Sequence, residues 1–280
     1  MFGTMRFTAR SLVAASAVVA LAAPLTPSPA QGSARSLVVL LAHADDETAA
    51  APALARYARE GVTVQMIIVS DGAGGSGRQP GSTRPDSGPV GEALVKARAE
   101  EARCAASALG AQAPMLLGFP DGKLGDYLGD RGLLYRVTER IAKELERLHP
   151  DVVVTWGPDG GTGHPDHRIV SDIVTQLQRT GAPGVPARLF YMYLPAESFR
   201  MANPERSAPP LLLPEAKYFT VSVPFTPADL EASLNALACH HTQMSPEAVQ
   251  RIRAGSARVW NGKVAFVPAS LATKGDDLFR

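Results

Sequence analysis

The sequence lacks an excess of charge of either sign. Its 280 residues include 28 lysines and arginines against 27 aspartates and glutamates, which gives a formal net charge of +1 at pH 7. A protein that attracts nucleic acid or an anionic membrane surface usually carries a strongly basic face. We therefore exclude nucleic acid as a partner and expect binding specificity to come from a local pocket.

Cysteine is also scarce, because the chain contains only Cys104 and Cys239. Two cysteines can form one disulfide at most, and their spacing in the sequence does not reveal the distance between their Cα atoms. Both lie in predicted helices among alanines and leucines, where a free thiol is commonly buried as a small hydrophobic group. We therefore favour two buried free thiols over a disulfide, and whether Cys104 and Cys239 pair stays open.

The N-terminal region lacks an apolar run of about 20 residues, the length that spans a bilayer as a helix. A shorter uncharged stretch follows Arg6 and Arg10 and ends before Ser28-Pro29-Ala30. This order of a positive segment, an apolar segment and a small-x-Ala site is typical of a cleaved secretory signal. It predicts a signal peptide over residues 1–30, an exported protein, and no stable membrane insertion after cleavage.

Residues 31–280 show no internal repeat and no long linker, so we expect a single domain. Apolar runs of strand length alternate with segments of helical periodicity as far as Gly181. The predicted strands are 36–42, 62–69, 114–117 and 151–155, and the predicted helices are 46–60, 91–109, 132–148 and 168–177. This alternation predicts an α/β fold, a Rossmann-like three-layer sandwich with a mostly parallel sheet.

Beyond Gly181 the patterns are weaker. The segments 189–193 and 218–223 have strand composition, and 227–240 has the composition of a helix. Residues 200–216 are rich in proline and predict a loop.

A first cluster of candidate metal ligands, His43-Ala44-Asp45-Asp46-Glu47, follows the first predicted strand. Ligands in open parallel sheets bind beyond the carboxyl ends of the strands. One aspartate can bind a metal beside His43 while the other acts as a base, and the residues alone do not tell which. The alternative is that both aspartates cap the next helix, because acidic residues favour the first turn. That alternative leaves His43 without a role.

A second cluster, His164-Pro165-Asp166-His167, follows the strand predicted at 151–155. Proline suits the first position of a helix, and two histidines three residues apart then share one helix face. One histidine can bind the metal while the other hydrogen-bonds a developing oxyanion, with Asp166 fixing a histidine tautomer. Together the two clusters can hold one zinc ion and leave an acid and a base free, which indicates a metal hydrolase.

A third pattern, a glycine-rich segment, matches a cofactor-binding motif but lacks the structure that the motif requires. Gly72, Gly74 and Gly77 match the G-x-G-x-x-G fingerprint of dinucleotide-binding proteins, which requires a helix to begin at the glycines. Residues 78–89 are instead rich in proline, serine and glycine. We therefore exclude a nicotinamide or flavin cofactor.

The two clusters resemble the motifs of the LmbE-like, or PIG-L, family of zinc-dependent N-acetylglucosaminyl deacetylases. The family's Ala-His-Pro-Asp-Asp-Glu appears at 42–47 with Ala44 in place of proline, and its His-Pro-Asp-His is intact at 164–167. Three further segments are similar to the family's pattern: Arg98-x-x-Glu101, 118–122 and 238–243.

The resemblance implies one zinc ion per chain, with His43, Asp46 and His167 as its ligands. It implies that Asp45 is the general base and that His164 stabilises the tetrahedral oxyanion with the support of Asp166. Arg98 and Asp121 fall at positions that are similar to sugar contacts in relatives. Deacetylases of the mycothiol pathway carry a tyrosine where this chain has Thr162, and thiol cofactors are made in the cytoplasm. Both the threonine and the predicted export argue against that branch.

We therefore predict an exported zinc-dependent hydrolase that removes the N-acetyl group from an N-acetylglucosamine-type amino sugar or glycoconjugate. An amidase for a non-sugar N-acyl substrate would use the same catalytic atoms and stays open. A non-catalytic, zinc-containing carbohydrate-binding protein would need the ligands but would have no use for the free Asp45. A metal phosphoesterase usually needs a second ion and a basic clamp, and Arg168 alone lies beside either motif.

Overall fold

The structure is a computed structural model that describes residues 1, 3, 35–75, 88–202 and 214–280. The described residues from 35 onward belong to one compact unit. The predicted signal peptide falls, apart from residues 1 and 3, outside the described residues. No helix among the described segments has both the length and the apolar character to cross a membrane.

Seven strands form one mixed sheet within the described residues, in the order β3-β2-β1-β4-β5-β7-β6. The strands are β1 Ser36–Leu41, β2 Thr63–Ser70, β3 Met115–Phe119, β4 Val152–Trp156, β5 Leu189–Met192, β6 Val221–Pro224 and β7 Lys263–Pro268. The five neighbours from β3 to β5 pair in parallel, and β7 runs antiparallel to both β5 and β6. The predicted α/β class with a mostly parallel sheet is confirmed.

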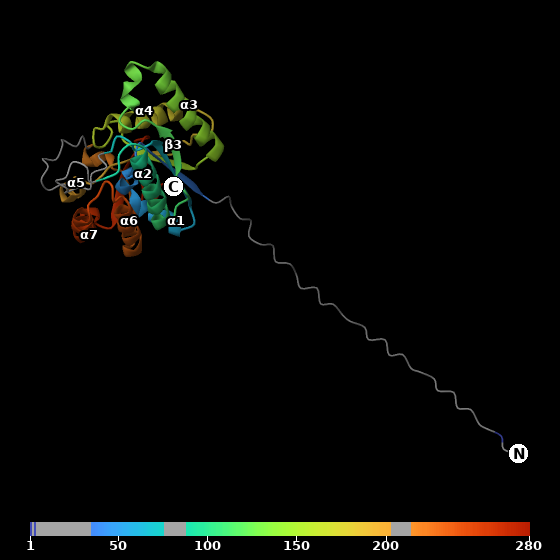
Figure 1. Cartoon of the computed structure of the whole chain (residues 1–280). Coiled ribbons are helices and arrows are strands. Elements are labelled where there is room, and N and C mark those ends of the chain that lie inside the picture. Colours follow the sequence, from blue (N-terminus) through green and yellow to red (C-terminus); the bar gives the residue numbers. More distant parts are fainter. Residues whose placement is uncertain (2, 4–34, 76–87, 203–213) are drawn as a thin grey trace. The chain divides into compact units, whose positions relative to one another are not determined.

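Helices cover both faces of the sheet (Figure 1). One face carries α1 Ala51–Arg59, α2 Glu92–Leu109 and α6 Pro227–Cys239, and the other carries α3 Arg131–Leu148 and α4 Pro165–Arg179. In β1, Leu37, Val39 and Leu41 pack into the first layer, whereas Val38 and Leu40 pack into the second. This alternation follows from the two-residue period of a strand and makes β1 the centre of both hydrophobic cores.

Two further helices, α5 Ala196–Ala202 and α7 Pro246–Trp260, follow β5 in the described part of the chain. Helix α7 packs on α5 and contributes Ile252 to a small cluster with Leu234 and Leu237 of α6. Neither α7 nor β7 was predicted, although Ser245 before Pro246 is a good helix start and caps Ala248. The loop predicted at 200–216 overlaps the end of α5, and its residues 203–213 lie outside the described residues.

The helix predicted at 46–60 is interrupted. Asp46–Ala49 form a 3-10 turn, η1, and α1 begins afresh at Ala51 with Pro52 in its first turn. Proline lacks a backbone N–H, so it suits the start of a helix and not its interior. The interruption separates the residues of the first motif from the helix that follows them.

The expectation of two free thiols is wrong. Cys104 of α2 and Cys239 at the end of α6 form a disulfide, with their Cα atoms 5.8 Å apart. The two helices pack against one another on the same face of the sheet. The cysteines are 135 residues apart in the sequence, so the sequence alone could not show that they are neighbours in the fold.

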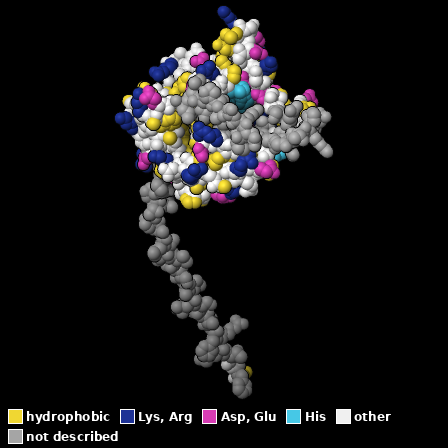
Figure 2. Space-filling model, turned by 90° about the vertical axis from the view of Figure 1, so that its left-hand side faces the viewer, with side chains coloured by type: hydrophobic (Ala, Val, Ile, Leu, Met, Phe, Trp, Pro, Cys, Tyr) yellow, Lys and Arg dark blue, Asp and Glu magenta, His cyan; other side chains and the backbone are white. Residues whose placement is uncertain are grey.

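Charges of both signs are mixed on the face of the molecule drawn in Figure 2. Figure 2 shows lysine and arginine side chains interspersed with acidic ones over the face in view. This agrees with the near-zero net charge of the chain.

Candidate metal centre

The two sequence motifs meet where the order of the sheet reverses. From β1 the chain proceeds to β2 and β3 on one side, and then crosses to β4 and β5 on the other. The loop after β1 carries His43, and the loop after the adjacent β4 leads into α4 with His164 and His167. Such a switch point leaves a crevice at the carboxyl ends of the two central strands, where ligands bind in this class of fold.

Three of the predicted ligands converge at this point. The Nδ1 atom of His43 lies 3.1 Å from Nε2 of His167, and that Nε2 lies 3.0 Å from Oδ1 of Asp46. The other oxygen of Asp46, Oδ2, lies 3.8 Å from Nδ1 of His43. Zinc bonds of about 2.1 Å in a tetrahedral arrangement place neighbouring ligand atoms about 3.4 Å apart. The three buried side chains therefore fit one ion without large movement.

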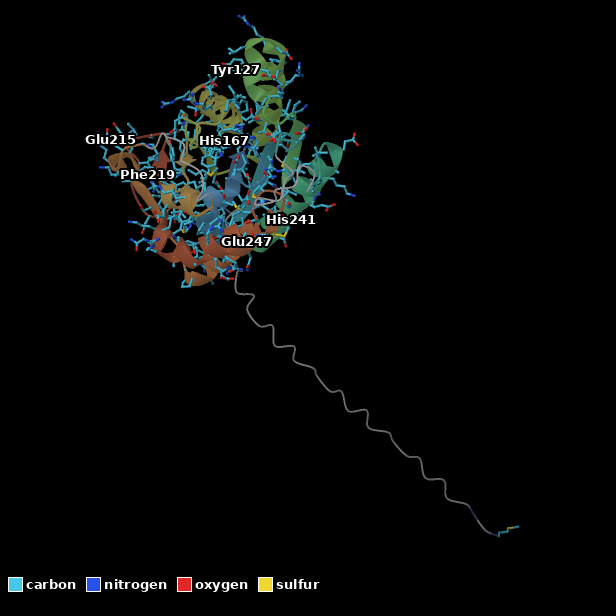
Figure 3. The ribbon with its side chains drawn as sticks, turned by 60° about the vertical axis from the view of Figure 1, so that its left-hand side comes forward. Tyr127, His167, Glu215, Phe219, His241 and Glu247 are labelled. Atoms are coloured by element: carbon cyan, nitrogen blue, oxygen red, sulfur yellow. A yellow bond between two sulfur atoms is a disulfide. The ribbon has the colours of Figure 1, made fainter. Side chains whose placement is uncertain are left out.

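His167 comes from α4 (Figure 3) and is held on two sides. Its ring lies flat against the indole of Trp156, and its Nδ1 is 3.0 Å from the carbonyl oxygen of Gly160 and 3.1 Å from Oγ1 of Thr162. A proton on Nδ1 that is donated to Gly160 leaves the lone pair of Nε2 free for a metal. Sequence reasoning gave no role to Trp156 or Gly160.

His43 faces carboxylates on its other edge. Its Nε2 lies 2.9 Å from Oδ1 of Asp121 and 3.4 Å from Oδ2 of Asp166. Burial lowers the pKa of His43, but the carboxylates of Asp121, Asp166 and Asp46 more than offset this and raise it to about 12. A carboxylate on one imidazole nitrogen orients the other toward a metal. Asp121 was predicted to contact the sugar, whereas its carboxylate here contacts His43 and lies 3.7 Å from Arg98.

Asp46 uses both of its oxygens. Its Oδ2 accepts hydrogen bonds from the backbone N–H groups of Ala42 and His43, at 3.0 and 2.8 Å. Burial alone would raise the pKa of this carboxyl, but His167 and His43 hold it well below its ordinary value. These donors precede Asp46, and Asp45 makes no side-chain hydrogen bond to η1. Neither aspartate caps the following helix through its side chain, so the capping alternative is not supported.

Asp45 stands apart from the three converging side chains. Its backbone is left-handed, with φ 100°, and its carboxylate is 30% exposed and 3.5 Å from Nη2 of Arg98. Burial raises the pKa of Asp45 and the positive charge of Arg98 lowers it, and the result is a pKa raised to about 6. A carboxylate with this pKa is ionised at neutral pH yet accepts a proton more readily than an ordinary aspartate.

His164 is the N-cap of α4. Its Nδ1 accepts a hydrogen bond from the backbone N–H of Asp166 at 3.1 Å, so the proton of the neutral ring belongs on Nε2. Burial and the neighbouring His43 and His167 lower the pKa of His164, which favours that neutral form. The ring is half-buried and its centroid is 4.6 Å from that of His43. His164 can therefore donate an N–H to an oxygen beside the converging ligands.

The carboxylate of Asp166 is fully buried and serves the loop after β3. It accepts hydrogen bonds from the backbone N–H groups of Gly122 and Leu124, at 2.8 and 3.1 Å. It acts on His164 through its charge and not through a carboxylate hydrogen bond among the described contacts.

Arg98 of α2 is buried beneath the glycine-rich turn whose sequence matches the dinucleotide-binding fingerprint. Its guanidinium donates to the carbonyl oxygen of Ala44 and lies beside Asp45 and Asp121. A Cβ atom at Gly72 would lie 2.8 Å from Cδ of Arg98, and one at Gly75 would lie 2.7 Å from its Nη1. These glycines let the backbone lie directly on the guanidinium. No helix begins at this turn before residue 76, where the described part of the segment ends.

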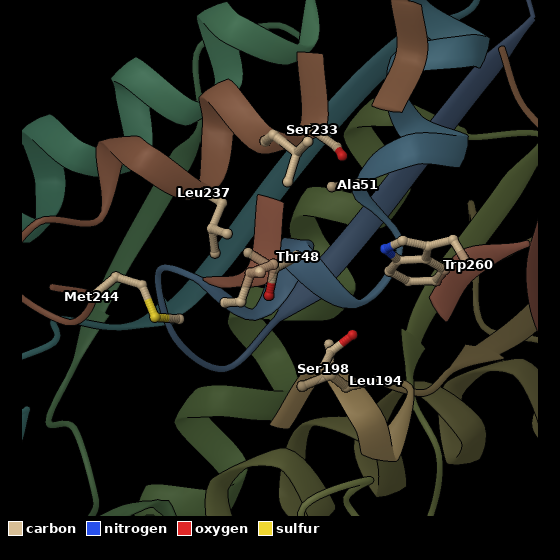
Figure 4. Close-up of a pocket in the computed structure, with 10 residues that line it drawn as sticks. Thr48, Ala51, Leu194, Ser198, Ser233, Leu237, Met244 and Trp260 are labelled. Carbon is tan, nitrogen blue, oxygen red and sulfur yellow. The ribbon is translucent and has the colours of Figure 1, made fainter. Parts of the chain in front are cut away.

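A separate cavity of about 60 Å³ lies next to η1 (Figure 4). Thr48 lines it together with Leu237, Met244 and Trp260. None of the predicted site residues lines this cavity, so it is distinct from the converging ligands.

Comparison with known proteins gives a family match over the same region. The PIG-L family, described as GlcNAc-PI de-N-acetylase, matches residues 38–178. A 1D-myo-inositol 2-acetamido-2-deoxy-α-D-glucopyranoside deacetylase from Rhodococcus jostii is 31% identical over 251 residues, which cover 76% of this chain and 83% of the relative. A protein of the same name from Corynebacterium urealyticum is 32% identical over 119 residues, and that match covers 36% of its length.

The fold is shared with solved structures. An N,N'-diacetylchitobiose deacetylase from Pyrococcus horikoshii superposes with a TM-score of 0.58 at 16% identity, covering 86% of this chain and 85% of that one. Together these matches confirm the predicted family resemblance and the predicted enzyme class, a metal-dependent N-deacetylase.

The predicted export is wrong. The relative from Rhodococcus jostii, which matches three quarters of the chain, is a deacetylase of an inositol-linked acetamido sugar. Relatives of this kind are cytosolic enzymes of mycothiol biosynthesis, and this contradicts the predicted export. The N-terminus, with two arginines followed by an alanine-rich stretch, has the composition of a secretory signal peptide. Composition alone did not identify the cellular location of the protein.

Proposed function

Since the chain belongs to the PIG-L family, we propose that it is a zinc-dependent hydrolase that removes the N-acetyl group from an N-acetylglucosamine-type amino sugar. One observation carries the proposal. His43, Asp46 and His167 converge on one point, and the carboxylate of Asp45 stands apart from them beside Arg98. The imidazole of His164 has a nitrogen within 4.8 Å of ring nitrogens of His43 and His167.

The donor set supports a metal. Two imidazole nitrogens and one carboxylate oxygen are a common ligand set of catalytic zinc, and contacts on the far side of each ring direct its other nitrogen inward. A zinc ion bound there supplies Lewis-acid chemistry, polarising an amide carbonyl and making water more acidic. Nitrogen and oxygen sites also accept iron and cobalt, so zinc is the finer part of the proposal.

Asp45 is proposed as the general base. It takes a proton from the water that adds to the acetamide carbonyl carbon, and its raised pKa suits that exchange near neutral pH. The carbon–nitrogen bond then breaks, and Asp45 returns the proton to the departing amine. The products are acetate and the free amino sugar.

His164 is proposed to stabilise the oxyanion. Its Nδ1 is occupied by the N–H of Asp166, so its Nε2–H is the donor available to an oxygen that gains negative charge. A buried Asp166 fixes the start of α4 and thereby the position of His164.

The amino sugar is proposed from the relatives, which act on an inositol-linked 2-acetamido-2-deoxy-glucopyranoside. Arg98 and Asp121 are proposed to bind the sugar, and their contacts with Asp45 and His43 also set the charge and position of those two residues. A non-sugar amide would meet the same catalytic atoms, whereas a protein that only binds sugar would have no use for a free Asp45.

A substrate panel tests this proposal. The zinc-loaded protein is incubated with 1D-myo-inositol 2-acetamido-2-deoxy-α-D-glucopyranoside, N,N'-diacetylchitobiose, N-acetylglucosamine and an N-acetylated amine without a sugar. We expect amine release and loss of an acetyl group from at least one sugar, and not from the non-sugar amide. Protein with one metal ion per chain that releases amine from none of the sugars would contradict the proposal.

A further inference from the structure

Glu47, the last residue of the first motif, contacts a histidine from the far end of the chain. Its Oε1 lies 2.5 Å from Nε2 of His240, which follows α6 and is fully buried. The other ring nitrogen of His240 has no hydrogen-bond partner among the described residues. The Glu47 carboxylate is therefore the one hydrogen-bond partner of the His240 imidazole among the described residues.

The second oxygen of Glu47 reaches the backbone of Asp45. Its Oε2 accepts the N–H of Asp45 at 3.1 Å. On the other side of the same residue, the hydroxyl of Thr48 donates to the carbonyl oxygen of Asp45 at 2.7 Å. Both peptide groups of Asp45 are thus held by side chains from η1.

Asp45 needs such support because its φ of 100° lies in the left-handed region. Residues other than glycine keep this conformation only where their surroundings impose it, and they often do so at functional sites. The turn lets two consecutive aspartates serve different partners. Asp46 faces His167, and Asp45 faces Arg98.

His240 is itself fixed from both sides by α2. Its neighbour Cys239 is joined by the disulfide to Cys104. Two residues after it, the N–H and the hydroxyl of Thr242 donate to Glu101, at 2.7 and 2.9 Å. The segment 238–243 is therefore tied to α2 on both sides of His240, and these contacts hold the His240 imidazole in place.

We propose that His240 is a positioning residue, which acts through Glu47 to hold the backbone of Asp45 in the conformation that presents its carboxylate to the substrate. The role as base rests on the proposed function, whereas the backbone relationship does not. His240 contacts none of the three converging ligands among its described hydrogen bonds and ion pairs. Its loss should therefore impair turnover without removing the metal.

The test compares His240→Ala with the conservative His240→Gln, whose amide can still donate to Glu47. His241→Ala is the matched control, because the side chain of that neighbouring histidine is 70% exposed and its described contacts are with Glu101 and the backbone of Cys239, not with Glu47. We expect kcat of His240→Ala to fall about tenfold to a hundredfold, as for small displacements of a catalytic group. KM should stay within about twofold and the metal content should stay at one per chain. His240→Gln should recover much of kcat, and His241→Ala should behave as the unmodified protein.

A crystal structure of His240→Ala provides a readout that does not need activity. We expect Asp45 to leave the left-handed region when Glu47 loses its partner. Unchanged kcat together with a retained Asp45 conformation would overturn the proposal, and so would a joint loss of metal, KM and kcat, which indicates a general structural role. If the unmodified protein releases no amine, the proposed function fails, and the conformation of Asp45 in the variant still decides the positioning claim.

Discussion

The imidazole of His167 lies parallel to the indole of Trp156, with ring centroids 4.7 Å apart and an angle of 6° between the planes. Trp156 is the last residue of β4, and the backbone of Gly161 packs against its ring. Together with the hydrogen bond to Gly160, this stacking fixes the plane of His167 before any metal binds. A residue of the central sheet, Trp156, thus sets the orientation of one of the predicted metal ligands.

Replacing Trp156 by leucine should weaken metal binding. The stacked ring is lost, so His167 gains freedom that binding must remove, and contacts that orient a ligand typically contribute tenfold or more in affinity. We expect an affinity about tenfold lower, measured by competition with a coloured chelator. Trp156→Phe keeps a ring at this position and should bind metal nearly as the unmodified protein does. Equal affinity of the leucine variant would show that stacking does not position His167.

The two adjacent aspartates should give different defects. Asp45→Asn should keep one metal per chain and lose activity by about 10²–10⁴-fold, because a general base is removed. Asp46→Asn should lose metal, because its Oδ1 faces His167. Metal analysis and amine release on both variants check this. Loss of metal in Asp45→Asn with retention in Asp46→Asn would show that the two roles are exchanged.

His164 has a capping role that must be separated from its chemistry. His164→Ser keeps a side-chain acceptor for the first turn of α4 but removes the Nε2–H donor. We expect turnover to fall about 10²–10³-fold with the melting temperature nearly unchanged. His164→Ala should show the same loss of turnover and a lower melting temperature. A near-normal rate in the serine variant would exclude His164 as the oxyanion donor.

Asp229 links stability to pH at the start of α6. Its carboxylate accepts the backbone N–H of Thr226 and is paired with Arg59 at 2.7 Å. Burial raises the pKa of Asp229, but Arg59 and the Thr226 donors lower it further, so the pKa lies below the ordinary value of 3.8. Because the folded pKa is lowered, the carboxylate stabilises the fold above pH 3.8, and this contribution is lost as the pH falls through the folded pKa.

Asp229→Asn should therefore destabilise the protein at pH 7 by about 1 kcal/mol, because it weakens the capping box with Thr226 and removes the ion pair with Arg59. The difference from the unmodified protein should shrink as the pH is lowered below 3.8. Urea unfolding of both proteins at several pH values measures it. A difference that is constant with pH would show that the charge of Asp229 does not contribute.

The sequence was sufficient to predict the central part of the fold. The strands that became β1 and β4 are short, apolar and β-branched, and each is followed by a histidine motif. In a parallel sheet the carboxyl ends of neighbouring strands meet at one edge, so the convergence of His43 with His167 follows from topology. The predicted sites of Asp45 and Asp46 are found beside them.

The remaining relationships depend on contacts that leave no local trace. Glu47 and His240 are 193 residues apart, and Cys104 and Cys239 are 135 apart. The packing of α6 against α2 brings the two cysteines together, and the packing of α6 against η1 and α1 brings His240 to Glu47. The sequence also gives no sign of the left-handed backbone of Asp45. Ala44 stands where the family motif has a proline, and neither residue type determines the φ of the residue that follows it. The sequence also could not show that the carboxylate of Asp121, a predicted sugar contact, faces His43.

The decisive experiment measures amine release from 1D-myo-inositol 2-acetamido-2-deoxy-α-D-glucopyranoside before and after metal removal. We expect a chelator to abolish release, and one equivalent of zinc per chain to restore it in the unmodified protein but not in Asp45→Asn. Release that persists in metal-free protein would exclude a catalytic metal, and release that returns fully in Asp45→Asn would exclude Asp45 as the general base.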